Sequence, residues 1–253
     1  MSTNNPRNVP TKRRGDRPGA MVDRSSLRLS AMLMLTGQIL FIVVTLFHAD
    51  GSANNHRSVF VEYAGSGSWK AVHVVQFAAI ALLLAGLLAL FFALDVQSGP
   101  ARWAGRFGAA SAVATLALYG VLQAVDGVGN KMVDAAWVSA PDAEKSARFA
   151  SAEAMRWLEW GVRSYQDFAL GLALLLLAAA VARTVGVPRP IAYLMGLSGL
   201  TYLVQGWVVG AEGFSTTHST LILVAYAFTL AWMIWLVVVA WRMHPSEAHH
   251  QAG

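Results

Sequence analysis

Histidine, carboxylate, arginine and glutamine side chains recur near the ends of long apolar stretches in this sequence. Histidines together with a carboxylate are common zinc ligands, two histidines bind haem iron in some cytochromes, and arginine binds anionic groups. Helical spacing places several of these residues on shared helix faces, as with His73 and Gln76. Nine residues form the predicted ligand-binding pocket: His48, His73, Gln76, Gln123, Asp126, Glu159, Arg163, Gln205 and His218.

His48, His73 and His218 lead to two cofactor hypotheses. In the first, two of them bind haem b between helices, as in membrane cytochromes. In the second, histidines and a carboxylate hold zinc, and Glu159 or Asp126 is the fourth ligand or the general base. No HExxH or HxxxH motif supports either hypothesis, and the absence of cysteine excludes thiolate ligands, cysteine nucleophiles and disulfides. The residues therefore leave both the cofactor and any catalytic residue unassigned.

Apolar helices are the elements that must position these side chains. Of the 253 residues, 56% are hydrophobic and 13% are charged, whereas about a quarter of the residues in a soluble domain are charged. A helix needs about 20 apolar residues to cross a bilayer. The sequence predicts an all-α polytopic membrane protein with one six-helix domain over 29–241, its helices at 29–48, 71–94, 107–126, 157–182, 191–210 and 219–241.

The fourth of these helices is the weakest prediction. Its uncharged part, Phe168–Ala182, has only 15 residues. It reaches spanning length only if the helix begins near Trp157, and the added turns then contain Glu159, Arg163 and Asp167. The charged turn is therefore expected to belong both to this helix and to the pocket.

Charge predicts how the helices are oriented. With a cytoplasmic N-terminus, the inner segments 1–28, 95–106, 183–190 and 242–253 hold twelve Lys and Arg and four Asp and Glu residues. The rest of the chain holds seven Lys and Arg and ten Asp and Glu residues. Because Lys and Arg collect on the cytoplasmic side of membrane proteins, both termini are expected in the cytoplasm, and the pocket residues at the outer ends of the helices. The expected location is the cytoplasmic membrane of the cell.

The net charge of +5 does not indicate nucleic-acid binding, because the basic residues flank apolar stretches, where they determine topology. The expected partner is the lipid bilayer, and a homo-oligomer is compatible with a small six-helix protein. Residues 1–28 are expected to be a disordered basic tail, either solvated or touching anionic headgroups through Lys12, Arg13, Arg14 and Arg17. Residues 242–253 form a second tail, either a frayed end or a weak metal-binding tract with His244, His249 and His250.

Two further patterns concern packing. After Pro141, apolar and charged residues alternate with helical spacing, and residues 131–156 therefore predict an amphipathic interfacial helix between the third and fourth spanning helices. Small residues four positions apart, at Gly206–Gly210 and Ala104–Gly108, predict close contacts between helices.

The layer of polar residues has two explanations. In the structural one, Glu159–Arg163 and Arg163–Asp167 are ion pairs along one helix, and the glutamines and Tyr119 form interhelical hydrogen bonds. In the functional one, the layer forms an outward-facing pocket in which Asp126 pairs with Arg163 or Lys131. Charged groups at such a depth are costly unless they are paired or hydrated, so both explanations place them inside the bundle.

The sequence has no phosphate-binding loop, dinucleotide fingerprint, nucleophile elbow or selectivity-filter motif. The two halves of the chain also lack the residue-level similarity expected of an inverted-repeat transporter. We therefore expect a non-enzymatic membrane protein whose pocket binds or moves a small molecule or a lipid. Two alternatives remain: a haem- or zinc-dependent membrane enzyme, and a scaffold or accessory subunit of a membrane complex.

Three short segments carry a resemblance to known sequences: Leu122–Val128 (LQAVDGV), Arg156–Gly161 (RWLEWG) and Gly210–Phe214 (GAEGF). They resemble a family of uncharacterised six-span integral membrane proteins from actinobacteria, and the resemblance extends over all six predicted helices. It implies a cytoplasmic-membrane protein without an assigned reaction, and it adds no residue to the predicted pocket.

Overall fold

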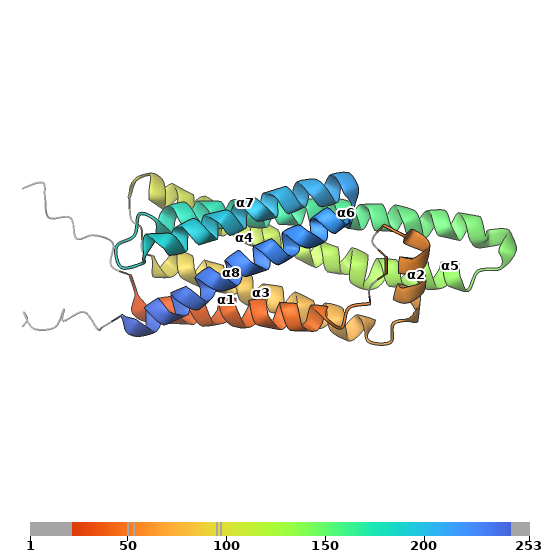
Figure 1. Cartoon of the computed structure of the whole chain (residues 1–253), viewed down its shortest axis with the longest axis horizontal. Coiled ribbons are helices and arrows are strands. Elements are labelled where there is room, and N and C mark those ends of the chain that lie inside the picture. Colours follow the sequence, from red (N-terminus) through yellow and green to blue (C-terminus); the bar gives the residue numbers. More distant parts are fainter. Residues whose placement is uncertain (1–21, 50, 53, 95, 97, 244–253) are drawn as a thin grey trace, which may run out of the picture.

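The computed structural model of this chain describes residues 22–243 apart from positions 50, 53, 95 and 97. This part of the chain is helical and contains no strand, as the sequence predicts. Six of its helices are long and apolar enough to cross a membrane (Figure 1), which fits a multi-pass membrane protein. The predicted tail features lie outside the described residues: Lys12, Arg13, Arg14, Arg17, His244, His249 and His250.

Five of the six long helices are single elements: α1 (Arg24–Thr45), α3 (Trp69–Ala93), α6 (Asp142–Val181), α7 (Arg189–Glu212) and α8 (Thr216–Arg242). Several begin before the predicted range, because polar residues outside an apolar stretch also complete helical turns. Asp23 shows how α1 gains its extra turn: its carboxylate accepts hydrogen bonds from the backbone N–H groups of Ser25 and Ser26, at 3.3 and 3.0 Å. Such a side chain satisfies donors that the first turn leaves unpaired.

The remaining long helix is interrupted by a wider turn. α4 (Gly99–Ala124) passes into the π-helical segment η1 (Val125–Asn130) and then into α5 (Lys131–Val138). α6 begins four residues later and runs without a proline to Val181, so its charged turn is part of one 40-residue helix. Residues 131–156, predicted as one amphipathic helix, are divided between two elements: residues 131–138 are α5, and residues 142–156 open α6.

α5 and the first turns of α6 form a hairpin that projects beyond the ends of the other long helices (Figure 1). The short helix α2 (His56–Gly65) packs against this hairpin through a buried cluster of Val59, Phe60, Tyr63, Trp69, Trp137 and Ala152. Lys131 Nζ donates hydrogen bonds to the carbonyl oxygens of Tyr63, Ala64 and Ser66, at 2.8, 2.9 and 2.8 Å. These carbonyls lie at the end of α2, where helical partners run out, and that of Tyr63 also accepts a hydrogen bond from the Ser66 backbone N–H at 3.3 Å. The lysine therefore fastens α2 to the hairpin.

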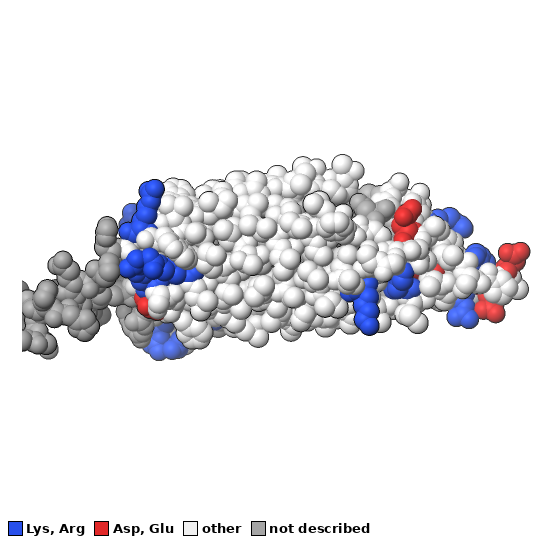
Figure 2. Space-filling model, turned by 90° about the horizontal axis from the view of Figure 1, so that it is seen from below, with Lys and Arg blue, Asp and Glu red and all other residues white. Residues whose placement is uncertain are grey.

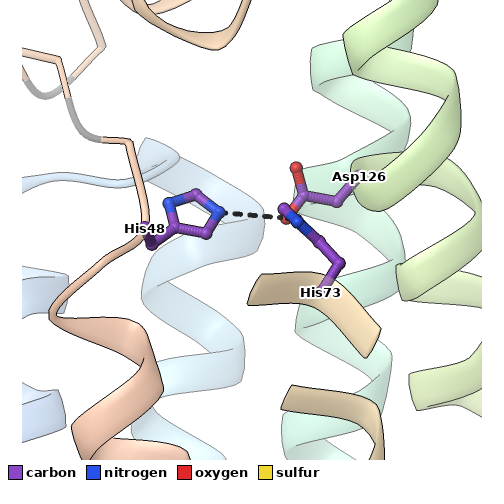
Figure 3. Close-up of side chains that lie close together, drawn as sticks. All are labelled: His48, His73 and Asp126. Carbon is purple, nitrogen blue, oxygen red and sulfur yellow. Dashed lines mark hydrogen bonds and ion pairs between the residues drawn. The ribbon is translucent and has the colours of Figure 1, made fainter. Parts of the chain in front are cut away.

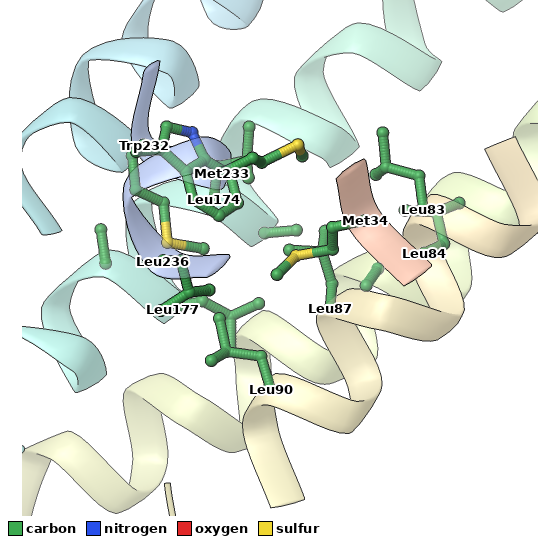
Figure 4. Packing of buried hydrophobic residues seen from close by; sticks show 14 of the residues in the cluster. Met34, Leu83, Leu84, Leu87, Leu90, Leu174, Leu177, Trp232, Met233 and Leu236 are labelled. Atoms are coloured by element: carbon green, nitrogen blue, oxygen red, sulfur yellow. The ribbon is translucent and has the colours of Figure 1, made fainter. Parts of the chain in front are cut away.

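Large apolar side chains fill the interior of the bundle below this region. Figure 4 shows leucines of α3 and α6 packed with Met34 of α1 and with Trp232, Met233 and Leu236 of α8. On the face drawn in Figure 2, Lys, Arg, Asp and Glu lie toward the two ends of the molecule, and the surface between them is free of these residues. The long helices also expose large apolar side chains, among them Ile39, Leu172 and Leu223. An apolar surface between charged ends is typical of a protein that contacts lipid.

The close helix contacts predicted at Gly206, Gly210 and Gly108 are confirmed, and that at Ala104 stays a prediction. A Cβ placed on Gly206 of α7 would lie 2.8 Å from the carbonyl oxygen of Ser164 in α6, and one on Gly210 would lie 2.9 Å from the Ser164 hydroxyl. A Cβ on Gly108 of α4 would lie 3.1 Å from the backbone nitrogen of Leu177 in α6. The helix backbones approach closely at these crossings, as small residues allow.

Candidate functional site

A cavity of about 560 Å³ lies where α2 and the projecting hairpin meet the ends of α1, α3 and α8. Seven of the nine predicted pocket residues line it: His48, Gln76, Gln123, Asp126, Glu159, Arg163 and His218. Phe41, Tyr119, Leu122, Ile222 and Tyr226 give it apolar and aromatic walls. The cavity therefore has both polar and apolar walls, and its polar share is larger than the few groups usual in a small-molecule site.

His73 and Gln205 have other positions. His73 lies behind Asp126, and its Nε2 is 3.2 Å from Asp126 Oδ2. Gln205 does not line the cavity; its Nε2 donates to the carbonyl oxygen of Leu221 at 3.3 Å, between α7 and α8. Of the two explanations of the polar layer, the structural one therefore holds for Gln205, which forms an interhelical hydrogen bond.

His48, His73 and Asp126 form a compact cluster at one side of the cavity (Figure 3). Besides the contact with His73, Asp126 Oδ2 lies 3.8 Å from His48 Nε2. The two imidazole rings pack with centroids 5.0 Å apart, and the indole of Trp69 lies 4.3 Å from the His73 ring. His48 follows the last turn of α1, so three separate elements contribute to the cluster.

Asp126 does not pair with Arg163 or Lys131, and both predicted partners are wrong. Lys131 instead donates its hydrogen bonds to backbone carbonyl oxygens at the end of α2. Arg163 pairs with Asp167, with 3.1 Å between Nε and Oδ2. The π-helical segment η1 contributes to this outcome, since it lies against α3 as well as α6.

A second network crosses the cavity wall between α6, η1 and α2. Arg156 Nη1 donates to Glu159 Oε2 at 2.7 Å and to the Tyr63 hydroxyl at 2.9 Å. Asn130 Nδ2 donates to Glu159 Oε2 at 2.6 Å and to Asp126 Oδ1 at 3.2 Å. Glu159 therefore pairs with Arg156 and not with Arg163, and Asn130 connects this ion pair to the histidine cluster.

Sequence reasoning did not assign Arg156 to the pocket, and it missed Tyr63. Arg156 had a usable signal, because it lies three residues before Glu159 in the same charged turn. Tyr63 had none, because it reaches Arg156 only through the packing of α2 on the hairpin.

On the other side of the cavity, several polar atoms lack partners among the described residues. Arg163 uses only Nε in a hydrogen bond, to Asp167, and neither of its terminal nitrogens has a partner there. His218 is 1% exposed, and its buried Nε2 makes no hydrogen bond within the described chain. The same holds for the buried Oε1 of Gln123. The buried atoms His218 Nε2 and Gln123 Oε1 would normally have a partner, and the Arg163 side chain is 16% exposed, so this side of the cavity can bind a polar group.

Two ionisable groups of the site lie outside the long helices. Burial lowers the pKa of His48, but the hydrogen bond to the Asp126 carboxylate and its negative charge outweigh burial, so this pKa lies above its ordinary value of 6.5. Burial raises the pKa of the Tyr63 hydroxyl well above 10.0, although Arg156 beside it opposes this effect. Tyr63 therefore remains a neutral hydrogen-bonding group at physiological pH.

The arrangement of His48 and His73 does not fit the haem hypothesis. A haem bound by both would have to lie between the two rings. Their centroids are only 5.0 Å apart, and both Nε2 atoms approach the same carboxylate. The zinc hypothesis is met in part, since His48, His73 and Asp126 come together while His218 stays apart from them.

No family model, curated protein or solved structure matches this chain.

Proposed function

We propose that this chain is a multi-pass protein of the cytoplasmic membrane whose cavity opens outward and binds a small anionic molecule. The observation that carries the proposal is Arg163 in the cavity wall, with both terminal guanidinium nitrogens free of partners among the described residues. Two parallel N–H groups of a guanidinium match the two oxygens of a carboxylate or phosphate. The buried Nε2 of His218 can donate a further hydrogen bond to the anion, and the buried Oε1 of Gln123 can accept one from a hydroxyl or N–H group of the ligand.

The cost of placing such groups inside a helix bundle supports a binding role. A charged residue in the membrane region is expensive unless it is paired, and such residues often mark ligand pathways. Asp167 balances the charge of Arg163 on one side only, through Nε. The aromatic rings of Phe41, Tyr119 and Tyr226 offer surface for the apolar part of the ligand.

Charge at the two ends of the bundle supports the outward orientation. The end opposite the cavity carries Arg24, Arg28, Arg102, Arg183 and Arg242 near the first or last turns of the long helices. With the two terminal segments included, the predicted inner segments hold twelve of the 19 Lys and Arg residues, a bias typical of the cytoplasmic side. Both termini then lie in the cytoplasm, and the hairpin of α5 and α6 stands at the outer surface. The exposed side chains of Met132 and Trp157 suit the lipid headgroup region there.

This proposal keeps the relation to the actinobacterial six-span family as a hypothesis. Two of the three segments of resemblance contain Asp126 and Glu159, which line the cavity. Members of that family are then expected to have carboxylates at both positions.

Thermal unfolding of the detergent-purified full chain tests the proposal. The probes are inorganic phosphate, succinate and a short-chain phosphatidic acid, which separate free anions from lipid headgroups. A ligand at 100 times its dissociation constant stabilises the folded state by about 2.7 kcal/mol, so at least one probe should raise the unfolding temperature. If none does, the proposal is wrong.

Variants then assign the effect to Arg163. Because Arg163→Gln alone leaves the buried Asp167 carboxylate without its partner, the test uses Arg163→Gln together with Asp167→Asn. This double variant should lose the ligand-induced shift. The control is Arg148→Gln, which removes an exposed arginine that pairs with Glu144 on the hairpin, and it should keep the shift. A shift that persists in the double variant would contradict the proposal.

A further inference from the structure

We propose that His48, His73 and Asp126 bind a divalent transition-metal ion at the edge of the cavity. Each residue offers one ligand atom, and these atoms lie within 4.8 Å of one another. Two of the separations are 3.2 Å, between His73 Nε2 and Asp126 Oδ2, and 3.8 Å, between His48 Nε2 and the same oxygen. Ligand atoms about 2.0–2.1 Å from a tetrahedral zinc ion lie roughly 3.3 Å apart, so only small movements are needed to close the site.

The hydrogen-bonding roles of His73 favour a cation at this position. Its Nδ1 is 2.8 Å from the carbonyl oxygen of Trp69, and because a carbonyl only accepts, Nδ1 carries a hydrogen. In a neutral imidazole the other nitrogen is then an acceptor. That acceptor, Nε2, faces the Asp126 carboxylate, which is also an acceptor when ionised. Two acceptors at 3.2 Å are held together by a cation between them, which is either a proton on Nε2 or a metal ion.

The surroundings of the cluster resemble those of metal ligands. A histidine that binds a metal usually donates its second ring N–H to a carbonyl or carboxylate, as His73 does to Trp69. The second carboxylate oxygen of Asp126, Oδ1, accepts a hydrogen bond from Asn130 Nδ2, and this bond orients the carboxylate. The indole Nε1 of Trp69 donates to the carbonyl oxygen of Gly127 at 2.9 Å, and this bond ties α3 to η1 beside the site.

The backbone around Asp126 also departs from a regular helix. η1 is π-helical, and π-helical turns within α-helices are frequent at functional sites. A Cβ on Gly127 would lie 3.1 Å from three atoms of His73, so glycine lets this turn approach the ring closely. The π-helical turn and Gly127 together bring the Asp126 carboxylate against two histidines, and a regular α-helix here would not do so.

The donor set identifies the class of metal. Two imidazoles and one carboxylate suit zinc and the other first-row divalent ions, whereas magnesium and calcium prefer oxygen ligands alone. Three protein ligands leave at least one coordination position for water or a ligand. His48 and Asp126 line the cavity, so the open position faces it. The metal site does not depend on the anion site at Arg163, and the two proposals are tested separately.

The experiment uses the full chain without an affinity tag, purified in detergent and stripped of metal with a chelator. Zn²⁺ is titrated in by calorimetry, and Co²⁺ is added as a spectroscopic probe whose visible absorption reports its coordination. One Zn²⁺ ion per chain should bind, with a rise in unfolding temperature that Mg²⁺ does not cause. Less than stoichiometric Zn²⁺ and Co²⁺ binding would overturn the proposal.

Four variants locate the ion. Asp126→Asn and His48→Gln should each weaken Zn²⁺ binding more than 100-fold, and the His48 variant is the safer one for folding because its side chain, 18% exposed, lies after the end of α1. Asn130→Ala should weaken binding by about 10- to 100-fold, as expected for a residue that orients a ligand. His56→Gln is the matched control, because His56 pairs with Glu153 away from the cluster, and it should bind Zn²⁺ like the unaltered protein.

Two further arms exclude other sources of binding. Replacement of His244, His249 and His250 by Asn should leave Zn²⁺ binding unchanged, and loss of binding in that variant would overturn the proposal. The double variant Arg163→Gln with Asp167→Asn should also retain Zn²⁺. Zn²⁺ binding without any response to the anionic probes would refute the proposed function and leave the metal site in place.

Discussion

The crossing of α6 and α7 at Gly171 and Gly199 leads to a sharp prediction about stability. A Cβ on Gly171 would lie 2.7 Å from the carbonyl oxygen of Gly199, and a Cβ on Gly199 would lie 2.8 Å from the carbonyl oxygen of Gly171. Side-chain Cβ atoms essentially never come closer than 3.0 Å to such an atom. Since the obstacle is backbone on both sides, no side-chain rotation relieves the clash, and Gly171→Ala must push the helices apart.

The magnitude follows from two opposing effects. Overpacking a close contact costs about 1–3 kcal/mol, whereas alanine is better than glycine in a helix by roughly 1 kcal/mol. The same helix contains a matched control in Gly161, where nothing lies within 4 Å of an added Cβ. Gly161→Ala should therefore stabilise the protein slightly, and Gly171→Ala should destabilise it. The difference between the two variants is the packing penalty itself, about 1–3 kcal/mol.

The assay is reversible unfolding of the detergent-purified protein, followed by circular dichroism during titration with a denaturing detergent. The free energies of unfolding of Gly161→Ala and Gly171→Ala are compared with that of the unaltered chain. Equal stability of the two variants would refute the close approach of the α6 and α7 backbones at this crossing. A stabilised Gly171→Ala variant would do so even more directly.

Three other predictions concern ionisable groups. Arg156→Met leaves Glu159, which is 3% exposed, with Asn130 as its one hydrogen-bond donor among the described residues, and should cost about 3–5 kcal/mol of unfolding free energy. Adding Glu159→Gln should recover part of that loss, and full additivity would argue against the ion pair. Asp134 is 0% exposed, and neither of its carboxylate oxygens has a hydrogen-bond partner within the described chain, so Asp134→Leu should raise the thermal stability by about 1–3 kcal/mol, and a lowered unfolding temperature would indicate a partner for this carboxylate. Hydrogen bonds from Ser26, and then from Ser25, lower the pKa of the Asp23 carboxyl group below its ordinary value of 3.8. The carboxylate therefore stabilises the first turn of α1 above pH 3.8. It loses this effect as the pH falls through the lowered pKa of the folded state. Hydrogen exchange of that turn in acid should show the loss, and Asp23→Ala should remove the pH dependence.

The sequence by itself determined the six helices and the level of the polar layer. Both depend on local properties: about 20 apolar residues predict a membrane-crossing helix wherever they occur. Antiparallel neighbours then bring alternate helix ends to the same level. For this reason seven of nine residues chosen from the sequence line one cavity, although they come from separate helices.

Tertiary structure decided which of these residues touch. The sequence paired Asp126 with Arg163 or Lys131, but the packing of η1 against α3 brings His73 to Asp126, and α2 occupies Lys131. Helix rotation and the widened π-helical turn set these contacts, and neither leaves a periodic signal in a single sequence. Tyr63 and the exclusion of Gln205 from the cavity likewise depend on contacts between segments far apart in the chain.

The hairpin of α5 and α6 shows the same division. The amphipathic pattern after Pro141 correctly predicted a helix over these residues, because periodicity is local. It did not reveal that this helix continues into the fourth spanning segment, since continuity depends on the absence of a break and on packing against α2 and α5. The local pattern therefore determined that the residues near Glu159 are helical, and only tertiary packing placed Glu159 and Arg156 beside Asn130 and the histidine cluster.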